Sequence, residues 1–129
     1  MINTNVFDYV NILDKAADAA WTRNETIANN IANASTPNYK RQDVSFESNL
    51  QKAFLATGED SLGNMVKNVN LNKVEANVYT DAKNFSYRLD GNNVDIDTEN
   101  VAMAENQIKY QGLINSINNQ FKNLQIVMK

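Results

Sequence analysis

The stretch Ala28–Gln42, which reads ANNIANASTPNYKRQ, decides where a long helix ends and how the chain leaves it. It contains Pro37, the only proline of the chain. A proline ring clashes with the preceding helical turn, and the residue before a proline is pushed out of the α region. We therefore expect the helix to stop near Ala34 or Ser35 and an extended polar segment to begin at Thr36.

Upstream of this stop, a helix is predicted over residues 5–35, because apolar or small residues recur in the heptad steps of a coiled-coil seam. The small residues Ala17 and Ala20 would let a neighbouring helix approach closely. Asn24 either fixes the register inside the seam or lies at its edge in contact with water. Trp21, beside the seam, is expected to pack rather than to bind a ligand. The seam comprises Val6, Val10, Leu13, Ala17, Ala20, Asn24, Ile27, Ile31 and Ala34.

A second seam helix is predicted over residues 97–129, with Asp97 as its cap and Glu99 in its first turn. Further apolar residues widen its stripe, which suits a helix with neighbours on more than one side. Pairing the two terminal helices would leave part of this stripe uncovered, so the pattern predicts an oligomer or filament. The seam comprises Met103, Gln107, Tyr110, Ile114, Ile117, Phe121, Leu124 and Met128, and the flanking residues are Val101, Ala104, Ile108 and Leu113.

The middle of the chain, residues 36–96, is predicted to be short and irregular. A small helix is expected near 46–56, and a loop is expected over 57–73 because glycine and asparagine interrupt every pattern there. Residues 74–80 fit a helix or a strand. Alternating apolar residues around Asp90-Gly91 predict a β-hairpin over 84–96.

These elements together predict a mainly α protein, a single domain over 1–129. Two long terminal helices would form a coiled-coil-like pair, and the middle would contain a small helix and a hairpin. The short basic run Tyr39–Gln42 is either a solvated turn or a contact to an acidic neighbour in an assembly.

Composition excludes several classes of function. The chain has 12 basic and 15 acidic residues, a net charge of −3, which argues against binding nucleic acid. It has no cysteine and no histidine, so disulfides, Cys/His zinc sites and histidine-based catalysis are excluded. Asp95 and Asp97 would be the only catalytic candidates, but they have no partner base, and the acid-rich segment lacks the spacing of a calcium loop. We therefore expect no catalytic residue, metal ligand or cofactor.

No run approaches the roughly 20 apolar residues that a membrane span needs, so no membrane insertion is expected. The start MINTNVFDYV lacks the basic and apolar regions of a cleavable signal peptide. This predicts a cytoplasmic protein or one exported by a route that needs no such signal.

Two stretches resemble bacterial flagellar rod and hook proteins. The N-terminal signature of that family is matched by Asn29, Asn30, Ile31, Ala32, Asn33, Thr36, Pro37, Tyr39 and Lys40. Asn38 stands where glycine is usual, a mild departure because Asn also tolerates left-handed backbone. Residues Asp90–Gln111, DGNNVDIDTENVAMAENQIKYQ, resemble the C-terminal signature of the family's proximal rod subunits.

The resemblance implies a structural subunit of the proximal rod in the flagellar basal body, a motility component that lies in the cell envelope. It implies type III export without a cleaved signal peptide, and terminal helices that pack with other rod subunits, transmit torque and form part of the export channel. It also implies self-association and contacts with the rod-to-ring adaptor and the export gate. The subunit-packing seam would comprise Val10, Leu13, Ala17, Ala20, Ile27, Ile31, Tyr110, Ile114, Ile117, Phe121 and Leu124. Two alternatives are a sister proximal-rod subunit of similar length and a free-standing coiled-coil adaptor.

Overall fold

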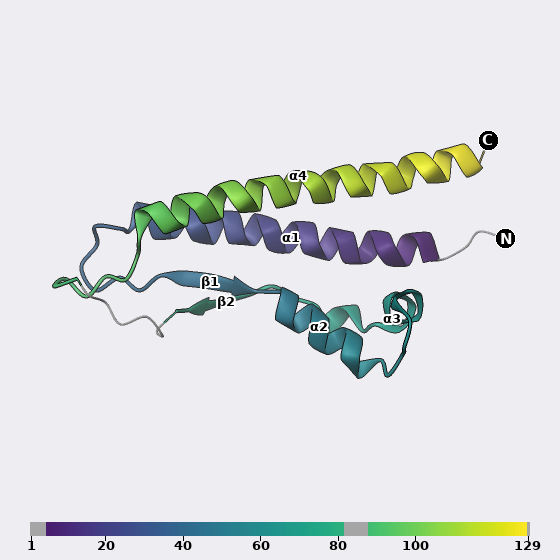
Figure 1. Ribbon diagram of the computed structural model, residues 1–129, viewed down its shortest axis with the longest axis horizontal. Coiled ribbons are helices and arrows are strands. Elements are labelled where there is room, and N and C mark those ends of the chain that lie inside the picture. The colour runs from purple at the N-terminus through teal and green to yellow at the C-terminus, as the bar shows by residue number, and fades with distance from the viewer. Residues whose placement is uncertain (1–4, 82–87, 129) are drawn as a thin grey trace.

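Two long helices, one from each end of the chain, form the body of the protein (Figure 1). The computed structural model describes residues 5–81 and 88–128. Helix α1 spans Asn5–Ala32 and helix α4 spans Ile96–Val127, and they lie side by side in opposite directions. The predicted pair of terminal helices is therefore confirmed. Among the described residues, no helix is both long and apolar enough to cross a membrane.

The end of α1 agrees with the proline argument. Helical residues stop at Ala32, and the next turn tightens, with Ala34 N donating to Ile31 O at 3.2 Å and Thr36 N to Asn33 O at 3.0 Å. Such three-residue bonds commonly close a helix end. Asn38 has a φ of 63°, the left-handed conformation expected where glycine is usual.

The start of α4 differs from the prediction by two residues. Asp95, not Asp97, caps the helix, because its Oδ1 accepts hydrogen bonds from the backbone N–H groups of Asp97 at 3.0 Å and Thr98 at 3.4 Å. The chain is fixed just before the cap, where Val94 is 3% exposed. Asp97 lies exposed in the first turn, where its charge faces the positive end of the helix.

The antiparallel pair of strands expected in the middle exists, but it does not lie at 84–96. Strand β1 spans Gln42–Ser45 and pairs with β2, Asn77–Thr80. Residues 84–87 of the predicted hairpin lie outside the described part of the chain. Residues 88–95 are described and form no strand, although Gly91, with φ 77°, makes the expected turn and donates to Arg88 O at 3.1 Å.

The lobe between the strands is more helical than the sequence predicted. Helix α2 spans Glu47–Ala56, close to the expected 46–56. The loop predicted over 57–73 contains helix α3, Leu62–Asn68, and a 3-10 turn, Leu71–Lys73. Helix α3 has an N-cap, because Ser61 Oγ accepts a hydrogen bond from Asn64 N at 3.3 Å, and it has a buried apolar residue, Val66, which is 6% exposed. The glycine and asparagine residues around them obscured both features in the sequence.

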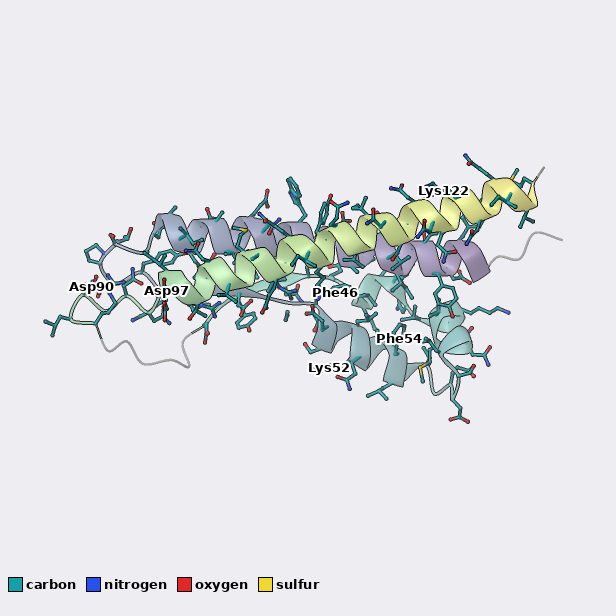
Figure 2. The ribbon with its side chains drawn as sticks, turned by 45° about the horizontal axis from the view of Figure 1, so that its top comes forward. Phe46, Lys52, Phe54, Asp90, Asp97 and Lys122 are labelled. Atoms are coloured by element: carbon teal, nitrogen blue, oxygen red, sulfur yellow. The ribbon has the colours of Figure 1, made fainter. Side chains whose placement is uncertain are left out.

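A small apolar core joins this lobe to α1. Its buried members are Ala19 of α1, Phe46 and Ala53 at α2, and Val74 before β2. Figure 2 shows Phe46 between the helix pair and the lobe. The lobe and the helix pair thus share one core.

We expect Phe46→Ala to lower the free energy of unfolding by about 3 kcal/mol, because it opens a cavity in this core. Urea denaturation followed by circular dichroism measures the change. Leu55→Ala is the matched control, since Leu55 lies on α2 and is 70% exposed, and it should change stability by no more than about 0.5 kcal/mol. Equal losses in the two variants would contradict the assignment of the core.

Candidate functional site

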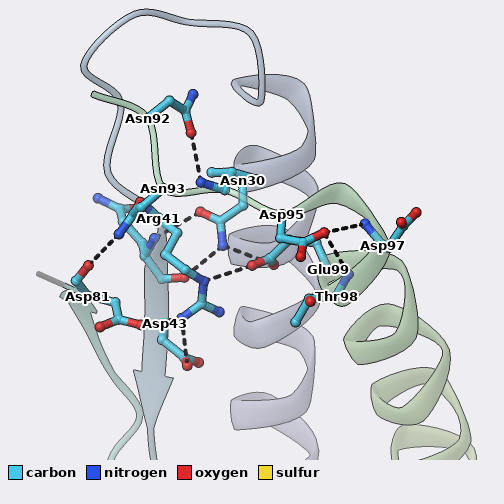
Figure 3. A network of polar contacts seen from close by, with 12 residues as sticks. Asn30, Arg41, Asp43, Asp81, Asn92, Asn93, Asp95, Asp97, Thr98 and Glu99 are labelled. Carbon is cyan, nitrogen blue, oxygen red and sulfur yellow. Dashed lines mark hydrogen bonds and ion pairs between the residues drawn. The ribbon is translucent and has the colours of Figure 1, made fainter. Parts of the chain in front are cut away.

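The stretch that ends α1 meets the start of α4 at a buried polar cluster, here called the hub, made by Asn30, Arg41, Asp81 and Glu99 (Figure 3). Asn30 is fully buried. Its Nδ2 donates to Gln42 O at 2.8 Å and to Glu99 Oε2 at 3.2 Å, and its Oδ1 accepts from Gln42 N at 2.9 Å. Asn30 therefore pairs with the backbone of β1 as a neighbouring strand would.

Arg41 supplies the positive charge of the hub. Its Nε donates to Glu99 Oε1 at 2.8 Å and one terminal nitrogen donates to Asp81 Oδ2 at 2.7 Å, while Asp43 lies 3.4 Å away. Burial lowers the pKa of Arg41, but the hydrogen bonds to Glu99 and Asp81 outweigh burial and raise it above its ordinary value. At Arg41, the basic run Tyr39–Gln42 is therefore not a solvated turn. The acidic partners of Arg41 lie in the same chain and not in a neighbouring subunit.

Asn92 closes the C-terminal end of α1. Its buried Nδ2 lies 2.8 Å from Asn33 O, 3.1 Å from Ala34 O and 2.9 Å from Thr36 O. One terminal nitrogen of Arg88 also donates to Ala34 O at 2.7 Å. These carbonyl groups belong to the turn that follows α1, so Asn92 and Arg88 fasten that turn to the segment before α4.

Most polar residues of the N-terminal signature hold this turn together. Tyr39 Oη donates to Asn30 Oδ1 at 3.0 Å, and burial together with the charge of Glu99 raises the pKa of Tyr39. Thr36 Oγ1 donates to Asn33 Oδ1 at 3.2 Å, and Lys40 Nζ donates to Gly91 O. Pro37, Asn29 and Ala32 are exposed, and Ile31 is half-buried.

A second polar contact, here called the clip, ties α2 to both long helices. The two terminal nitrogens of Arg23 donate to the carboxylate of Glu47 at 2.9 and 2.8 Å, and Lys109 Nζ donates to the same carboxylate. The hydrogen bonds from Arg23 hold the pKa of Glu47 well below its usual range, against the opposing effect of burial, and Lys109 adds to this lowering. The same pairing raises the pKa of Arg23.

The predicted seam residues of α1 are buried or half-buried wherever their side chains are described. Ala17, Ala20 and Ile27 are buried, and Val10, Leu13 and Ile31 are half-buried. The side chain of Val6 lies outside the part that the structure describes. Asn24 belongs to the contact, because its Oδ1 accepts from Asn106 Nδ2 at 2.8 Å. Trp21 is 54% exposed and packs against Tyr110, with 6.0 Å between the ring centroids.

The inner face of α4 departs from the predicted seam at three positions. Gln107 is exposed, Phe121 is 47% exposed and Met128 is 70% exposed. Asn106 and Gln120 face inward in place of Gln107 and Phe121, and Glu99 and Asn106 hydrogen-bond α1. The half-buried residues that agree with the predicted seam are Met103, Tyr110, Ile114, Ile117 and Leu124.

Sequence reasoning named Asn30 in the signature but missed the hub carboxylates Asp81 and Glu99, and it missed Asn92 near the hub. Glu99 was expected only as a first-turn residue near the helix end, yet it is 1% exposed. The spacing of the seam could have predicted that Glu99 faces inward, since Glu99 lies four residues before Met103, which is one step of the seam. Asp81 and Asn92 gave no comparable signal, because both lie outside regular helix. In the described ranges, no group of three or more Asp and Glu side chains is arranged to hold a metal ion.

Comparison with known proteins agrees with this architecture. Residues 11–40 match the family model described as flagella basal body rod protein. The flagellar basal body rod protein FlgB of Bacillus subtilis is 35% identical over 117 residues, covering 90% of this chain and 89% of the relative. FlgB of Borreliella burgdorferi is 40% identical over 121 residues, covering 87% and 89%, and FlgB of Salmonella typhimurium is 34% identical over 114 residues, covering 83% of each.

The family model and these relatives place the chain in the class of flagellar basal body rod proteins. The chain belongs to the FlgB family of flagellar basal body rod proteins. It is a structural subunit of the proximal rod, located in the flagellar basal body, and membership of this family implies assembly with other rod subunits.

We expect Glu99→Gln to lower the free energy of unfolding by about 2–3 kcal/mol, because it removes the more deeply buried of the two carboxylates that pair closely with Arg41. Urea denaturation at pH 7 measures the loss. Glu105→Gln removes the same charge from an exposed position of α4 and should cost no more than about 0.5 kcal/mol. A Glu99→Gln variant as stable as the wild type would show that the hub contributes nothing to stability.

The clip should give a pH-dependent contribution to stability. Because the folded pKa of Glu47 is lowered, its contribution is present above the unfolded pKa of about 4.3 and is lost as the pH falls through the lower folded pKa. Glu47 is 53% exposed, so solvent screening limits the effect to roughly 0.5–1 kcal/mol. The gap in unfolding free energy between wild type and Glu47→Gln should therefore narrow from pH 7 to pH 3. Glu25→Gln is the control, because Glu25 is exposed on α1 and its loss reports the effect of removing a surface charge. If the difference in unfolding free energy between wild type and Glu47→Gln widens on acidification, the lowered pKa of Glu47 is contradicted.

Proposed function

We propose that the α1–α4 pair is the building unit of this rod subunit, and that the outer face of α4 packs against helices of neighbouring axial subunits. The observation that carries this proposal is an exposed apolar stripe on α4. Val101 is 59% exposed, Ile108 is 75% exposed, and Ala104 between them is also exposed.

This outer stripe lies on the side of α4 that α1 does not cover. Its members follow helical steps of three and four residues, so they share one face. Fully burying a Val or Ile side chain contributes about 1.5–3 kcal/mol, which an isolated subunit forgoes at these positions. A helix that is apolar on two sides suits a filament, in which each subunit has one helix partner inside the chain and others outside it.

We divide the predicted subunit-packing seam between two kinds of contact, one inside the chain and one with neighbouring subunits. Its buried residues, such as Ala17, Ala20 and Ile27, serve the contact inside the chain. Ile114, Ile117 and Leu124 are only half-buried, and neighbouring subunits can cover what remains of their surface. Self-association in the rod would use the same faces.

The hub and the clip support a role in transmitting torque. They fasten α1, β1, α2 and α4 to one another by charge-assisted hydrogen bonds, which are stronger and more directional than neutral ones. The shared core around Phe46 supports treating residues 1–129 as a single rod-type domain. Such a unit would transmit force without independent motion of the lobe.

The remaining parts of the proposal concern partners and chemistry. The subunit would contribute to the export channel, contact the rod-to-ring adaptor and the export gate, and leave the cell by type III export without a cleaved signal peptide. Its role is structural, without catalysis, metal or cofactor. The lack of histidine and cysteine in the sequence supports this, as does the engagement of the hub carboxylates by Arg41.

We expect Ile108→Asp to abolish rod assembly while leaving the fold of the subunit intact. The new carboxylate would be buried without a partner at each contact in the filament, at a cost of several kcal/mol, but it would face water in the free subunit. Swimming in soft agar and isolation of basal bodies measure assembly, and the melting temperature of the purified chain reports the fold.

Gln111→Glu is the matched control, because it adds one negative charge to an exposed polar position of the same helix. It should support swimming. If cells with Ile108→Asp swim as well as the control, the outer stripe is not a subunit contact. Retention of Ile108→Asp in the cytoplasm would place the defect in export.

A further inference from the structure

Helix α4 has two candidate inner faces, and its apolar residues favour the one that the structure does not use. Both faces share Met103, Tyr110, Ile117 and Leu124, and they differ in the positions between these residues. The face in use places Asn106 and Gln120 there, whereas the alternative face would place Gln107 and Phe121 there, and Leu113 and Ile114 are both half-buried. Burial of apolar surface alone would favour the second set, since it exchanges Gln120 for Phe121. Because half of the positions are shared, the two faces differ by a rotation of about half a residue, about 50° about the helix axis.

Asn106 holds α4 in the less apolar arrangement. It is 4% exposed, and its Nδ2 donates to Ala20 O at 2.7 Å and to Asn24 Oδ1 at 2.8 Å. The small side chain of Ala20, 1% exposed, allows the amide to reach the backbone of α1. Rotation of α4 toward the alternative face would carry Asn106 away from both acceptors.

Asn106 also lowers the stability of the fold through one unpaired atom. Asn106 Oδ1 is buried and has no hydrogen-bond partner among the described residues. A buried acceptor left unpaired destabilises a protein relative to an apolar side chain of similar shape. Stability therefore does not explain why an asparagine occupies this position. In helix seams, buried asparagine pairs fix one arrangement among several at the expense of stability.

We propose that the Asn24–Asn106 pair selects the face of α4 that packs on α1. Glu99, one heptad earlier, fixes only the first turns of α4 through Asn30 and Arg41. Asn106 carries the same orientation into the middle of the helix and thereby keeps Phe121 on the outside. The inference goes beyond the proposed function, because it concerns packing within one chain and does not depend on assembly.

Cysteine reporters test the proposal, since the chain contains no native cysteine. Gln107→Cys and Gln120→Cys are made separately in the full chain, and their rates of maleimide labelling are compared. With the native pair, position 107 is exposed and position 120 half-buried, so the first should label faster. In an Asn24→Leu/Asn106→Leu background the ratio of the two rates should fall by about fivefold or more as position 107 turns inward. Helical circular dichroism and the melting temperature should be equal to or higher than those of the wild type.

Asn118→Leu/Asn119→Leu is the control, because it adds the same two leucines at exposed positions of α4 and should leave the ratio unchanged. An unchanged ratio in the folded Asn24→Leu/Asn106→Leu variant would overturn the proposal. A lower melting temperature or lost helicity in that variant would also overturn it, because the pair would then be retained for stability.

Discussion

A carboxylate buried at the start of α4 is the constraint on which the rest of the structure depends. Glu99 is 1% exposed, and a charge so far from water is tolerated only when it is paired and hydrogen-bonded. Its partners are Arg41, 58 residues away, and Asn30, 69 residues away. This requirement brings the end of α1, the first strand and the start of α4 to one point. Arg41 in turn fixes Asp81 after β2, so the small sheet is held by the same group of charges.

This constraint gives a physical meaning to the sequence signature at the end of α1. Asn30 uses both ends of its amide, as donor to Glu99 and as acceptor from the backbone of Gln42, and aspartate or leucine could not do both. Tyr39 and Thr36 complete the turn with their hydroxyl groups. The polar residues of the signature thus stabilise the subunit itself, and the exposed Pro37 sets the direction in which the chain leaves the helix.

The hub also determines which surfaces remain for neighbours. Once Glu99 and Asn106 face α1, the stripe through Val101 and Ile108 must face outward, because residues on opposite sides of one helix cannot both be covered by a single partner. The clip through Glu47 holds the lobe of α2 against the helix pair and leaves that outer stripe free. Family membership implies assembly with other rod subunits, and the exposed apolar face of α4 is the surface that we propose for this contact.

The sequence by itself determined the two terminal helices, the stop before Pro37, the short helix α2 and the seam of α1. Each of these depends on local backbone sterics or on periodicity within one element, which a sequence displays directly. Tertiary structure decided the cap at Asp95, the pairing of β1 with β2, the helix α3 and the rotation of α4. The strands that pair are separated by 31 intervening residues, and their pairing depends on charges that meet only after folding. Apolar periodicity alone would have turned Phe121 inward. Glu99 and Asn106 override it, because a buried polar group that misses its hydrogen bonds costs more than an apolar side chain left in water.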